Sequence, residues 1–155
     1  MGFMKNKKFV LSLCGAFVLG VVLGGYLFAR TLPRSFLALN HCQGTCFQAN
    51  ELLGLFASVG IQQLPALIPK VVMETDKTIV IEHPSPQARI HYLIIPKRDI
   101  KNVGELSAAD NEYLVDMLRV AGEVIREQKL TSYKLISNGP AYQGVTYMHF
   151  HLMAQ

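Results

Sequence analysis

The first 30 residues of this chain lack acidic side chains, and the remainder lacks an excess of basic ones. That first segment holds Lys5, Lys7, Lys8 and Arg30, so the formal net charge of +4 belongs to it alone. A domain that binds nucleic acid would show a basic excess or a basic stripe. We therefore expect no nucleic-acid partner, although a few local groups could still hold a small anionic ligand.

The chain also lacks internal repeats and low-complexity tracts, and its 155 residues leave room for one small domain. Composition and pattern divide it into three parts. We expect a membrane anchor at residues 1–30, a connector with a short helix at residues 31–68, and a folded domain at residues 69–155.

Cysteine is scarce, with three residues in the whole chain. Cys14 lies inside an apolar run, whereas Cys42 and Cys46 form a small cluster with His41. In an oxidising compartment these two thiols could form a disulfide, and in a reducing one they could supply half of a zinc site. Two unlinked thiols are the third interpretation, and the spacing alone does not choose among them.

Residues 9–28 contain no charged side chain. About 20 apolar residues span a bilayer as a helix, and a cleaved signal peptide usually has a shorter apolar region that ends at a small-residue cleavage site. We therefore expect an uncleaved membrane-spanning helix. Three lysines before the run, against Arg30 and Arg34 after it, favour a cytoplasmic N-terminus with the domain on the far side of the membrane. The opposite topology stays open.

The pattern after the anchor predicts five strands and one long helix. Strands are expected at residues 70–74, 77–82, 89–95, 132–137 and 145–153, and a short helix at residues 50–59. The long helix begins at Ser107, which forms a capping-box variant with Asp110. Because this helix precedes the last two strands, we expect an α+β meander in which those strands form a hairpin-like edge.

Two histidines stand in the last expected strand, whose residues 147–153 read YMHFHLM. Because strand side chains alternate between faces, His149 and His151 point to one side, and Met148, Phe150 and Leu152 point into the core. Two neighbouring imidazoles can bind a metal ion or attack a phosphorus atom.

Three segments in order resemble the histidine-triad (HIT) family of nucleotide-binding hydrolases, in particular its Hint-like members. They are residues 85–97 (SPQARIHYLIIPK), 138–143 (NGPAYQ) and 147–153, the last of which follows the family pattern His-φ-His-φ-His-φ-φ, where φ is apolar, except that Tyr147 stands at the first histidine. The resemblance implies a HIT-like α+β fold, with a five-stranded antiparallel sheet and one long helix, here preceded by an N-terminal transmembrane helix. It also implies a homodimer.

The family hydrolyses nucleoside phosphoramidates or related nucleotidyl phosphate derivatives through a nucleotidyl-histidine intermediate. The resemblance makes His149 the nucleophile, since a neutral imidazole can attack phosphorus near pH 7. His151, Asn138 and Gln143 match catalytic positions that contact the transferring phosphate and the leaving group. The partner is thus expected to be a nucleotide-type small molecule, with no metal ion or other cofactor required.

Three further residues are expected to contact the substrate. His91 matches a histidine beside the triad, Tyr147 replaces the first triad histidine, and His83 stands where the family commonly has an acid that binds the ribose. Because the last two departures each weaken part of the pattern, one alternative is a non-catalytic, membrane-anchored HIT-like nucleotide-binding module. A second alternative is a metal-binding domain that uses His149 and His151, with or without Cys42 or Cys46.

Overall fold

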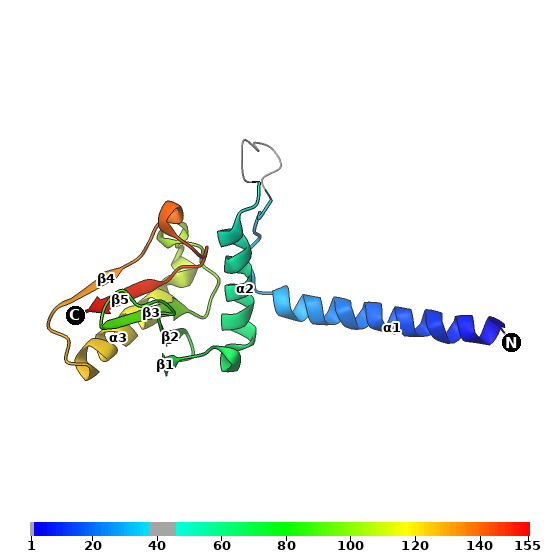
Figure 1. Ribbon diagram of the computed structural model, residues 1–155, viewed down its shortest axis with the longest axis horizontal. Coiled ribbons are helices and arrows are strands. Elements are labelled where there is room, and N and C mark those ends of the chain that lie inside the picture. Colours follow the sequence, from blue (N-terminus) through cyan, green and yellow to red (C-terminus); the bar gives the residue numbers. More distant parts are fainter. Residues whose placement is uncertain (1, 38–45) are drawn as a thin grey trace. The chain divides into compact units, whose positions relative to one another are not determined.

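The computed structural model describes residues 2–37 and 46–155, so His41 and Cys42 lie outside the described residues (Figure 1). Cys46 takes part in a disulfide bond, and Cys14 is a free thiol. The chain forms two compact units, Met1–Arg30 and Thr31–Gln155. The expected connector, residues 31–68, therefore folds with the domain that follows it.

The first unit consists of one helix, α1 (Gly2–Phe28). Within its residues Lys7–Phe28, an 18-residue window reaches a mean hydropathy of 2.2, and this segment is long and apolar enough to cross a membrane. Among the residues that the structure describes, no other helix meets this test.

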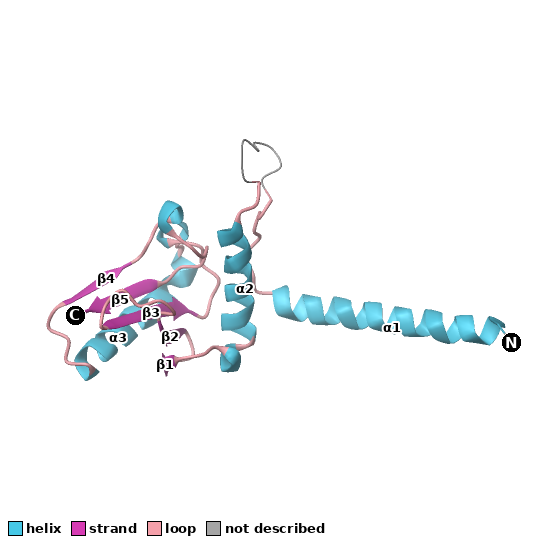
Figure 2. Ribbon diagram, viewed as in Figure 1, coloured by secondary structure: helices cyan, strands magenta, loops and turns pink. Residues whose placement is uncertain are grey.

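The second unit is built on one antiparallel sheet with the strand order β1-β2-β3-β5-β4 (Figure 2). The strands are β1 (Val71–Glu74), β2 (Thr78–Glu82), β3 (Ile90–Pro96), β4 (Tyr133–Ile136) and β5 (Phe150–Ala154), and the helices are α2 (Ala49–Gln63) and α3 (Asn111–Glu127). The five-stranded antiparallel sheet with one long helix after the third strand is confirmed. The last two strands, β4 and β5, pair antiparallel at one edge of the sheet, as expected. The sheet is not a simple meander, however, because the connection that carries α3 places β4 at the edge and leaves β5 between β3 and β4.

The last strand is shorter than expected, since β5 begins at Phe150 and not at residue 145. Before that point the backbone bonds elsewhere. The Met148 amide donates to the Ile100 carbonyl at 2.6 Å, and the Tyr147 amide donates to the Val145 carbonyl at 2.8 Å. Alternation nevertheless continues through the irregular segment, because Met148 and Leu152 are fully buried in the core on one face.

The two faces of the sheet are covered by different helices. On one face the core lies between the strands and α3, and contains Val80, Ile94, Ile100, Met117, Val120, Ala121, Val124, Met148 and Leu152. On the other face a smaller core joins α2 to the sheet, and contains Ile61, Ile79, Ile95 and Tyr147. Alternate residues of β2 and β3 face opposite cores, as the period of two requires. The histidines lie on the α2 side.

α3 begins later than expected, at Asn111, after a single 3₁₀ turn at Ala108–Asp110. The capping interaction of Ser107 is present, because its backbone N–H and its hydroxyl both donate to Asp110, at 2.8 and 2.6 Å. α2 continues to Gln63, four residues beyond the expected end.

A buried ion pair fixes the segment that precedes α2. Arg34 donates to the Asp99 carboxylate at 2.7 Å, and both side chains are only 1% exposed. The other Asp99 oxygen accepts from the Ser58 hydroxyl of α2 and from the Leu32 amide. Arg34 also donates to the carbonyl of Thr146, which lies just before Tyr147. One carboxylate thus ties the connector and α2 to the rest of the domain.

Candidate functional site

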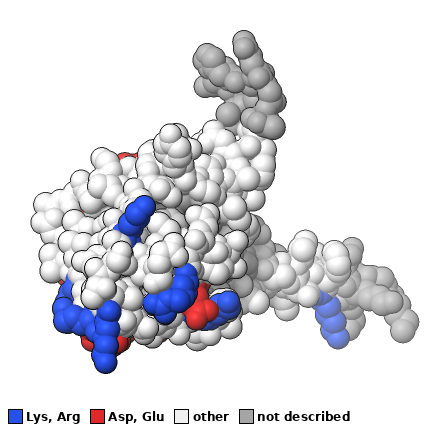
Figure 3. Space-filling model, turned by 60° about the vertical axis from the view of Figure 1, so that its left-hand side comes forward, with Lys and Arg blue, Asp and Glu red and all other residues white. Residues whose placement is uncertain are grey.

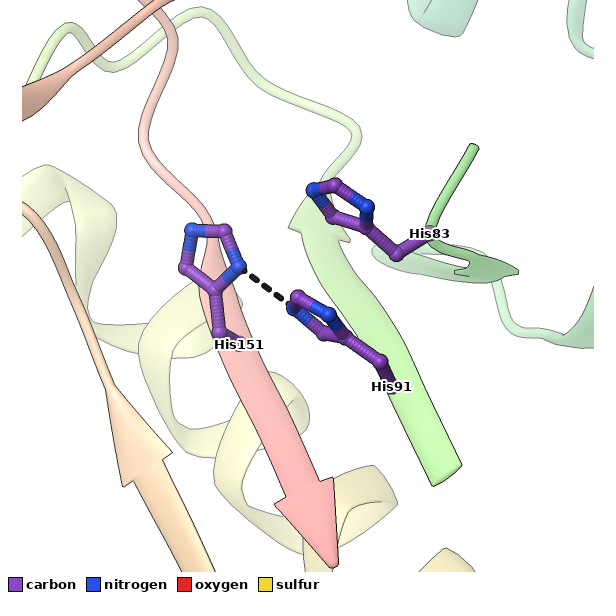
Figure 4. A group of neighbouring side chains, drawn as sticks. All are labelled: His83, His91 and His151. Carbon is purple, nitrogen blue, oxygen red and sulfur yellow. Dashed lines mark hydrogen bonds between the residues drawn. The ribbon is translucent and has the colours of Figure 1, made fainter. Parts of the chain in front are cut away.

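Four histidines meet on the α2 face of the sheet. His91 lies on β3 and His151 on β5, whereas His83 directly follows β2 and His149 directly precedes β5. The His83 and His91 rings stack with centroids 4.0 Å apart, and Figure 4 shows both rings beside that of His151. His91 and His151, sixty positions apart in sequence, are therefore brought together by the pairing of β3 with β5.

Hydrogen bonds link three of these rings in a row. His91 Nε2 lies 2.9 Å from His151 Nδ1, and His151 Nε2 lies 3.1 Å from His149 Nε2. The row ends on the backbone at both sides. The Gln87 amide donates to His91 Nδ1 at 3.1 Å, and His149 Nδ1 lies 2.7 Å from the Tyr147 carbonyl oxygen.

These two ends assign the proton on every ring in the row. A backbone N–H can only donate, so His91 Nδ1 accepts, and in the neutral ring Nε2 carries the proton. That proton points at His151 Nδ1, so His151 must carry its own proton on Nε2. At the other end a carbonyl can only accept, so His149 is protonated on Nδ1. His149 Nε2 therefore carries no proton, and its lone pair accepts from His151 Nε2–H in this arrangement.

Asn138 completes the surroundings of His151. Its Nδ2 atom lies 3.3 Å from His151 Nε2. Because our tautomer assignment makes that ring nitrogen a donor, the amide group must turn by 180° and present its oxygen, an exchange that leaves its shape unchanged. The structure thus places Asn138, as the sequence predicts, against a triad histidine.

The electrostatics of the cluster favour neutral rings. Burial is the main cause that lowers the pKa of His149, with a smaller contribution from His83 in the same direction and an opposing one from the Tyr147 carbonyl. Burial together with His149, His91 and His83 lowers the pKa of His151 to about 4. Burial and His83 also lower the pKa of His91. Near neutral pH, His149 therefore keeps its lone pair and His151 acts as a neutral N–H donor.

A cavity of about 700 Å³ opens beside the histidines. Its wall includes His83, Asn138, His149 and His151 at one end. Most of the remaining wall comes from α2, from the turn η1 (Pro65–Leu67) that follows it, and from β2 and β3. The sequence pattern does not predict that α2 forms this wall, and only the structure shows that the apolar face of α2 is partly unpacked at the exposed Phe56.

Tyr147 does not present its hydroxyl to this site. The phenol donates to the Pro96 carbonyl at 2.8 Å, and the residue is 1% exposed. Burial is the main cause that raises its pKa well above the usual value, so the phenol stays protonated. Only the ring and the backbone carbonyl of Tyr147 reach the site, the ring as cavity wall and the carbonyl as partner of His149.

Gln143 also points away from the histidines. Its side chain is buried and donates to the Lys101 carbonyl at 3.0 Å, and it does not line the cavity. In this arrangement it does not meet the predicted phosphate contact, because the 3₁₀ turn at Pro140–Tyr142 directs it into the domain. His83, by contrast, lies against His91, with its Nδ1 accepting from the Ser85 amide at 3.0 Å.

The ring nitrogens of His83, His91 and His151 lie within 4.8 Å of one another, close enough to consider a metal ion (Figure 4). A metal-bound histidine normally donates its other ring N–H to an acceptor. At His83 and His91 the other nitrogen, Nδ1, instead accepts from a backbone N–H. If Nε2 of His83 or His91 bound a metal ion, the ring proton would move to Nδ1 and would face the backbone N–H that now donates there. These histidines therefore fit hydrogen bonding better than metal ligation.

Comparison with known proteins agrees with this architecture. Residues 66–155 match the sequence model of a family described as "Scavenger mRNA decapping enzyme C-term binding". An uncharacterized HIT-like protein of Synechococcus elongatus is 31% identical over 102 residues, which cover 64% of this chain and 87% of the relative. The purine nucleoside phosphoramidase of Escherichia coli is 29% identical over 103 residues, covering 64% and 84%.

Solved structures give the same result. A HIT family hydrolase from Legionella pneumophila matches with a TM-score of 0.56 and 29% identity, over 61% of this chain and 88% of that one. A HIT family hydrolase from Clostridium thermocellum matches equally well, with a TM-score of 0.56 and 29% identity over 63% and 89%. Together with the antiparallel sheet and the neighbouring histidines His149 and His151, these matches show that this chain belongs to the HIT family.

Proposed function

We propose that this protein hydrolyses nucleoside phosphoramidates or related nucleotidyl phosphate derivatives, with His149 as the nucleophile. The observation that carries the proposal is the unprotonated Nε2 of His149, a residue of the cavity wall, because the Tyr147 carbonyl holds the proton of this ring on Nδ1. The similarity to a purine nucleoside phosphoramidase supports the same reaction class.

The reaction then proceeds in two displacements. His149 Nε2 attacks phosphorus and forms an N–P bond, while the bond to the leaving group breaks and its electron pair goes to the leaving atom, which takes a proton from water. A water molecule next attacks phosphorus and the N–P bond breaks, so the imidazole regains its lone pair. The proton that this water loses neutralises the hydroxide that the first step left in solution. When His149 Nε2 attacks, its lone pair no longer accepts from His151, and the Nε2–H of neutral His151 then donates to a non-bridging oxygen as charge develops there. His91 acts as a positioning residue, since it fixes the tautomer of His151.

The test is turnover of a fluorogenic adenosine phosphoramidate by the full chain, compared with His149→Ala. We expect kcat to fall at least a thousandfold in the variant, because the covalent step loses its nucleophile. Circular dichroism should show an unchanged fold, and acid-quenched parent enzyme should carry the nucleotidyl group on His149 by mass spectrometry. Full turnover by His149→Ala would refute the nucleophile assignment. Nucleotide binding by a well-folded parent without any turnover would favour the non-catalytic binding module.

We also infer that α1 anchors the chain in a membrane and that the N-terminus is cytoplasmic. The orientation rests on the basic residues on the two sides of the span, which are the lysines before it and Arg30 after it. Arg34 no longer counts in this comparison, because its buried pairing with Asp99 requires it in either topology. A cysteine introduced at exposed Glu127 should react with an impermeant thiol reagent on intact cells. Labelling only after lysis would reverse the orientation.

A further inference from the structure

The backbone that leads into His149 lies outside the sheet. β5 begins at Phe150, and its register pairs with β3 and β4 lie at that residue and beyond. The Tyr147 carbonyl nevertheless holds the His149 ring by its Nδ1 proton, at 2.7 Å. When His149 Nε2 turns its lone pair to phosphorus, it gives up the bond from His151, and the bond to this carbonyl remains. The place of the Tyr147 carbonyl therefore has to be set by contacts from elsewhere in the fold.

Two peptide groups meet at the Cα of Tyr147, and each is held by a residue far away in the sequence. A peptide group is planar, so the Tyr147 carbonyl moves together with the Met148 N–H, which donates to the Ile100 carbonyl at 2.6 Å. The preceding group carries the Thr146 carbonyl, which accepts from Arg34 Nη2 at 2.9 Å. If either contact is lost, one backbone dihedral of Tyr147 is released, and its carbonyl can turn away from the nucleophile.

Arg34 is an interior charge whose geometry favours the contact with Thr146. Figure 3 shows Lys and Arg side chains on the molecular surface, several of them beside acidic ones, whereas the Arg34 and Asp99 side chains are only 1% exposed. One nitrogen of Arg34, Nη2, donates both to Asp99, at 2.7 Å, and to Thr146. An arginine that pairs with a carboxylate frequently uses two nitrogens, but Nε and Nη1 of Arg34 have no partner among the residues that the structure describes. Asp99 thus aims a single nitrogen at the Thr146 carbonyl.

The helix α2 closes around the same carbonyl. An added Cβ at Gly54 would overlap the Thr146 carbonyl oxygen and would lie 2.8 Å from Arg34 Nε, so only glycine fits there without a shift of its neighbours. Glycine inside a helix is unfavourable relative to alanine, and here it permits the close approach of α2 to the Arg34–Thr146 contact. The Thr146 amide also donates to the Asn50 carbonyl of α2, at 3.0 Å. Both backbone polar groups of Thr146 are therefore held.

We propose that Arg34 is a positioning residue for His149, the proposed nucleophile. Arg34 holds the Thr146 carbonyl, and this contact keeps the Tyr147 carbonyl in place on His149 Nδ1, so that Nε2 faces phosphorus without a proton. The proposal rests on the proposed function and adds to it a residue of segment 31–37, which follows α1. A residue outside the part of the chain that matches the family model, residues 66–155, thus helps to position the nucleophile.

The first experiment moves the Thr146 carbonyl without removing either charge of the ion pair. Gly54→Ala does so, because the added Cβ must displace that carbonyl or Arg34 Nε. Single-turnover rates are measured with the full chain in phosphatidylcholine nanodiscs, in excess over a fluorogenic adenosine phosphoramidate. We expect the rate constant at saturation to fall about tenfold to a hundredfold, because a displacement of about 1 Å costs up to that much. Substrate affinity should stay within about threefold of the parent, since Gly54 does not line the cavity.

Gly122→Ala on α3 is the matched control. It also replaces a helical glycine with alanine, and the nearest atom to its added Cβ is Arg126 Nη1 at 3.3 Å, the end of a flexible side chain. It should keep both the rate constant and the affinity of the parent. An equal loss of rate in Gly122→Ala would mean that the effect is common to helical glycines, and would overturn the proposal.

Substitution of Arg34 itself gives a second test. Arg34→Met should lower the single-turnover rate constant at least as much as Gly54→Ala does. Arg34→Lys should recover most of the loss, because an ammonium group can donate to both acceptors from one nitrogen, as Nη2 does. A folded Arg34→Met that keeps the parent's rate, or an Arg34→Lys no faster than a folded Arg34→Met, would overturn the proposal. If circular dichroism shows that Arg34→Met does not fold, Gly54→Ala decides.

Nuclear magnetic resonance reads the contact without turnover. The chemical shift of the proton on His149 Nδ1 reports the strength of its hydrogen bond to the Tyr147 carbonyl, and its signal is identified in isotope-labelled protein by its absence from His149→Ala. This signal should move upfield in Gly54→Ala and stay in place in Gly122→Ala. A loss of overall stability alone would not move it, because the signal comes from folded molecules.

The outcomes separate this proposal from the proposed function. A lower rate together with an upfield shift in Gly54→Ala supports both. An active parent whose rate is kept in Gly54→Ala, or a lower rate with an unmoved His149 signal, overturns the positioning role and leaves the hydrolase. An inactive parent overturns the proposed function. In that case a shift of the signal in Gly54→Ala still supports the positioning of the His149 ring by Arg34, and an unmoved signal refutes it.

Discussion

Tyr147 makes two separate contacts near the site, one through its backbone carbonyl and one through its phenol. Its backbone carbonyl orients His149, which any residue could do, whereas its phenol is committed to the Pro96 carbonyl inside the α2-side core. The departure from the family pattern therefore removes an imidazole without removing the backbone contact that orients His149. On this basis the tyrosine is compatible with catalysis.

We expect Tyr147→Phe to lower the free energy of unfolding by about 1–3 kcal/mol, because it leaves the buried Pro96 carbonyl without its donor. Because the phenol does not reach the histidines, kcat/KM should stay within threefold of the parent. Urea unfolding and steady-state kinetics of the full chain measure the two quantities. Tyr142→Phe, at a residue 84% exposed, removes the same hydroxyl from the surface and should change neither. A tenfold or larger loss of kcat/KM in Tyr147→Phe would show that the phenol acts in the reaction.

The residues of the site were predictable to different degrees. His149 and His151 followed from the period of two, and the structure places them 3.1 Å apart. The tautomers of the rings were not predictable. They depend on the backbone N–H groups of Ser85 and Gln87, and no local sequence pattern shows that these groups donate to histidine rings. Gln143 was expected at the site from the resemblance alone, and its loop instead directs it to Lys101.

At the scale of elements, the alternation of apolar residues located all five strands to within a few residues, except at the start of β5. There, tertiary hydrogen bonds from Met148 to Ile100 replace pairing with β3, and tertiary contacts commonly override local propensity. The role of Arg34 was also hidden, since its partner Asp99 lies 65 positions later in the sequence. From sequence alone, Arg34 counts as one of the basic residues that indicate membrane topology. The structure shows that it is needed instead to pair with the buried Asp99.

Arg34→Met should lower the free energy of unfolding by about 3–5 kcal/mol, because it leaves the Asp99 carboxylate buried without its cation. Asp99→Asn should be similarly harmful. The double variant should cost clearly less than the sum of the two, because each change removes the same interaction. Lys77→Met is the matched control, since its ion pair with Glu112 is exposed and should be worth less than about 1 kcal/mol. Strict additivity in the cycle would show that the pair is not coupled.

At the scale of the whole molecule, the cavity arises only from the assembly of distant elements. Residues of α2 and η1 cover β2 and β3, and the histidines close one end. A sequence read segment by segment identifies α2 as an amphipathic helix, but its apolar face is shared between core and cavity. Ile61 is 6% exposed and packs against Ile95, whereas Phe56 is 61% exposed at the rim. The angle at which α2 crosses the sheet decides which of its apolar residues remain unpacked. The spacing of apolar residues in the sequence does not predict that angle.

The clustering of imidazoles also gives the whole domain a dependence on pH. His91, His149 and His151 all have pKa values below that of an exposed histidine, which is about 6.5. The unfolded chain therefore binds protons near pH 6.5 that the folded chain does not bind until its lower pKa values are reached, about 4 for His151. The stability contributed by these neutral rings is complete above pH 6.5 and is lost as the pH falls from there toward 4.

We therefore expect the free energy of unfolding to be constant between pH 8 and 7 and to fall by about 1–3 kcal/mol between pH 6.5 and 4.5. Asp110 and Asp116 have pKa values lowered from 3.8, so their contributions are lost only below about pH 4 and do not overlap this window. Urea unfolding of the full chain in nanodiscs, followed by tyrosine near-ultraviolet circular dichroism, measures the effect. His151→Asn should make the decline shallower, because it removes the ring whose pKa is lowered to about 4. A stability that stays flat from pH 7 to 4.5 in the parent would mean that the rings take up protons as easily as in water, and the tautomer row that prepares His149 would then not persist in solution.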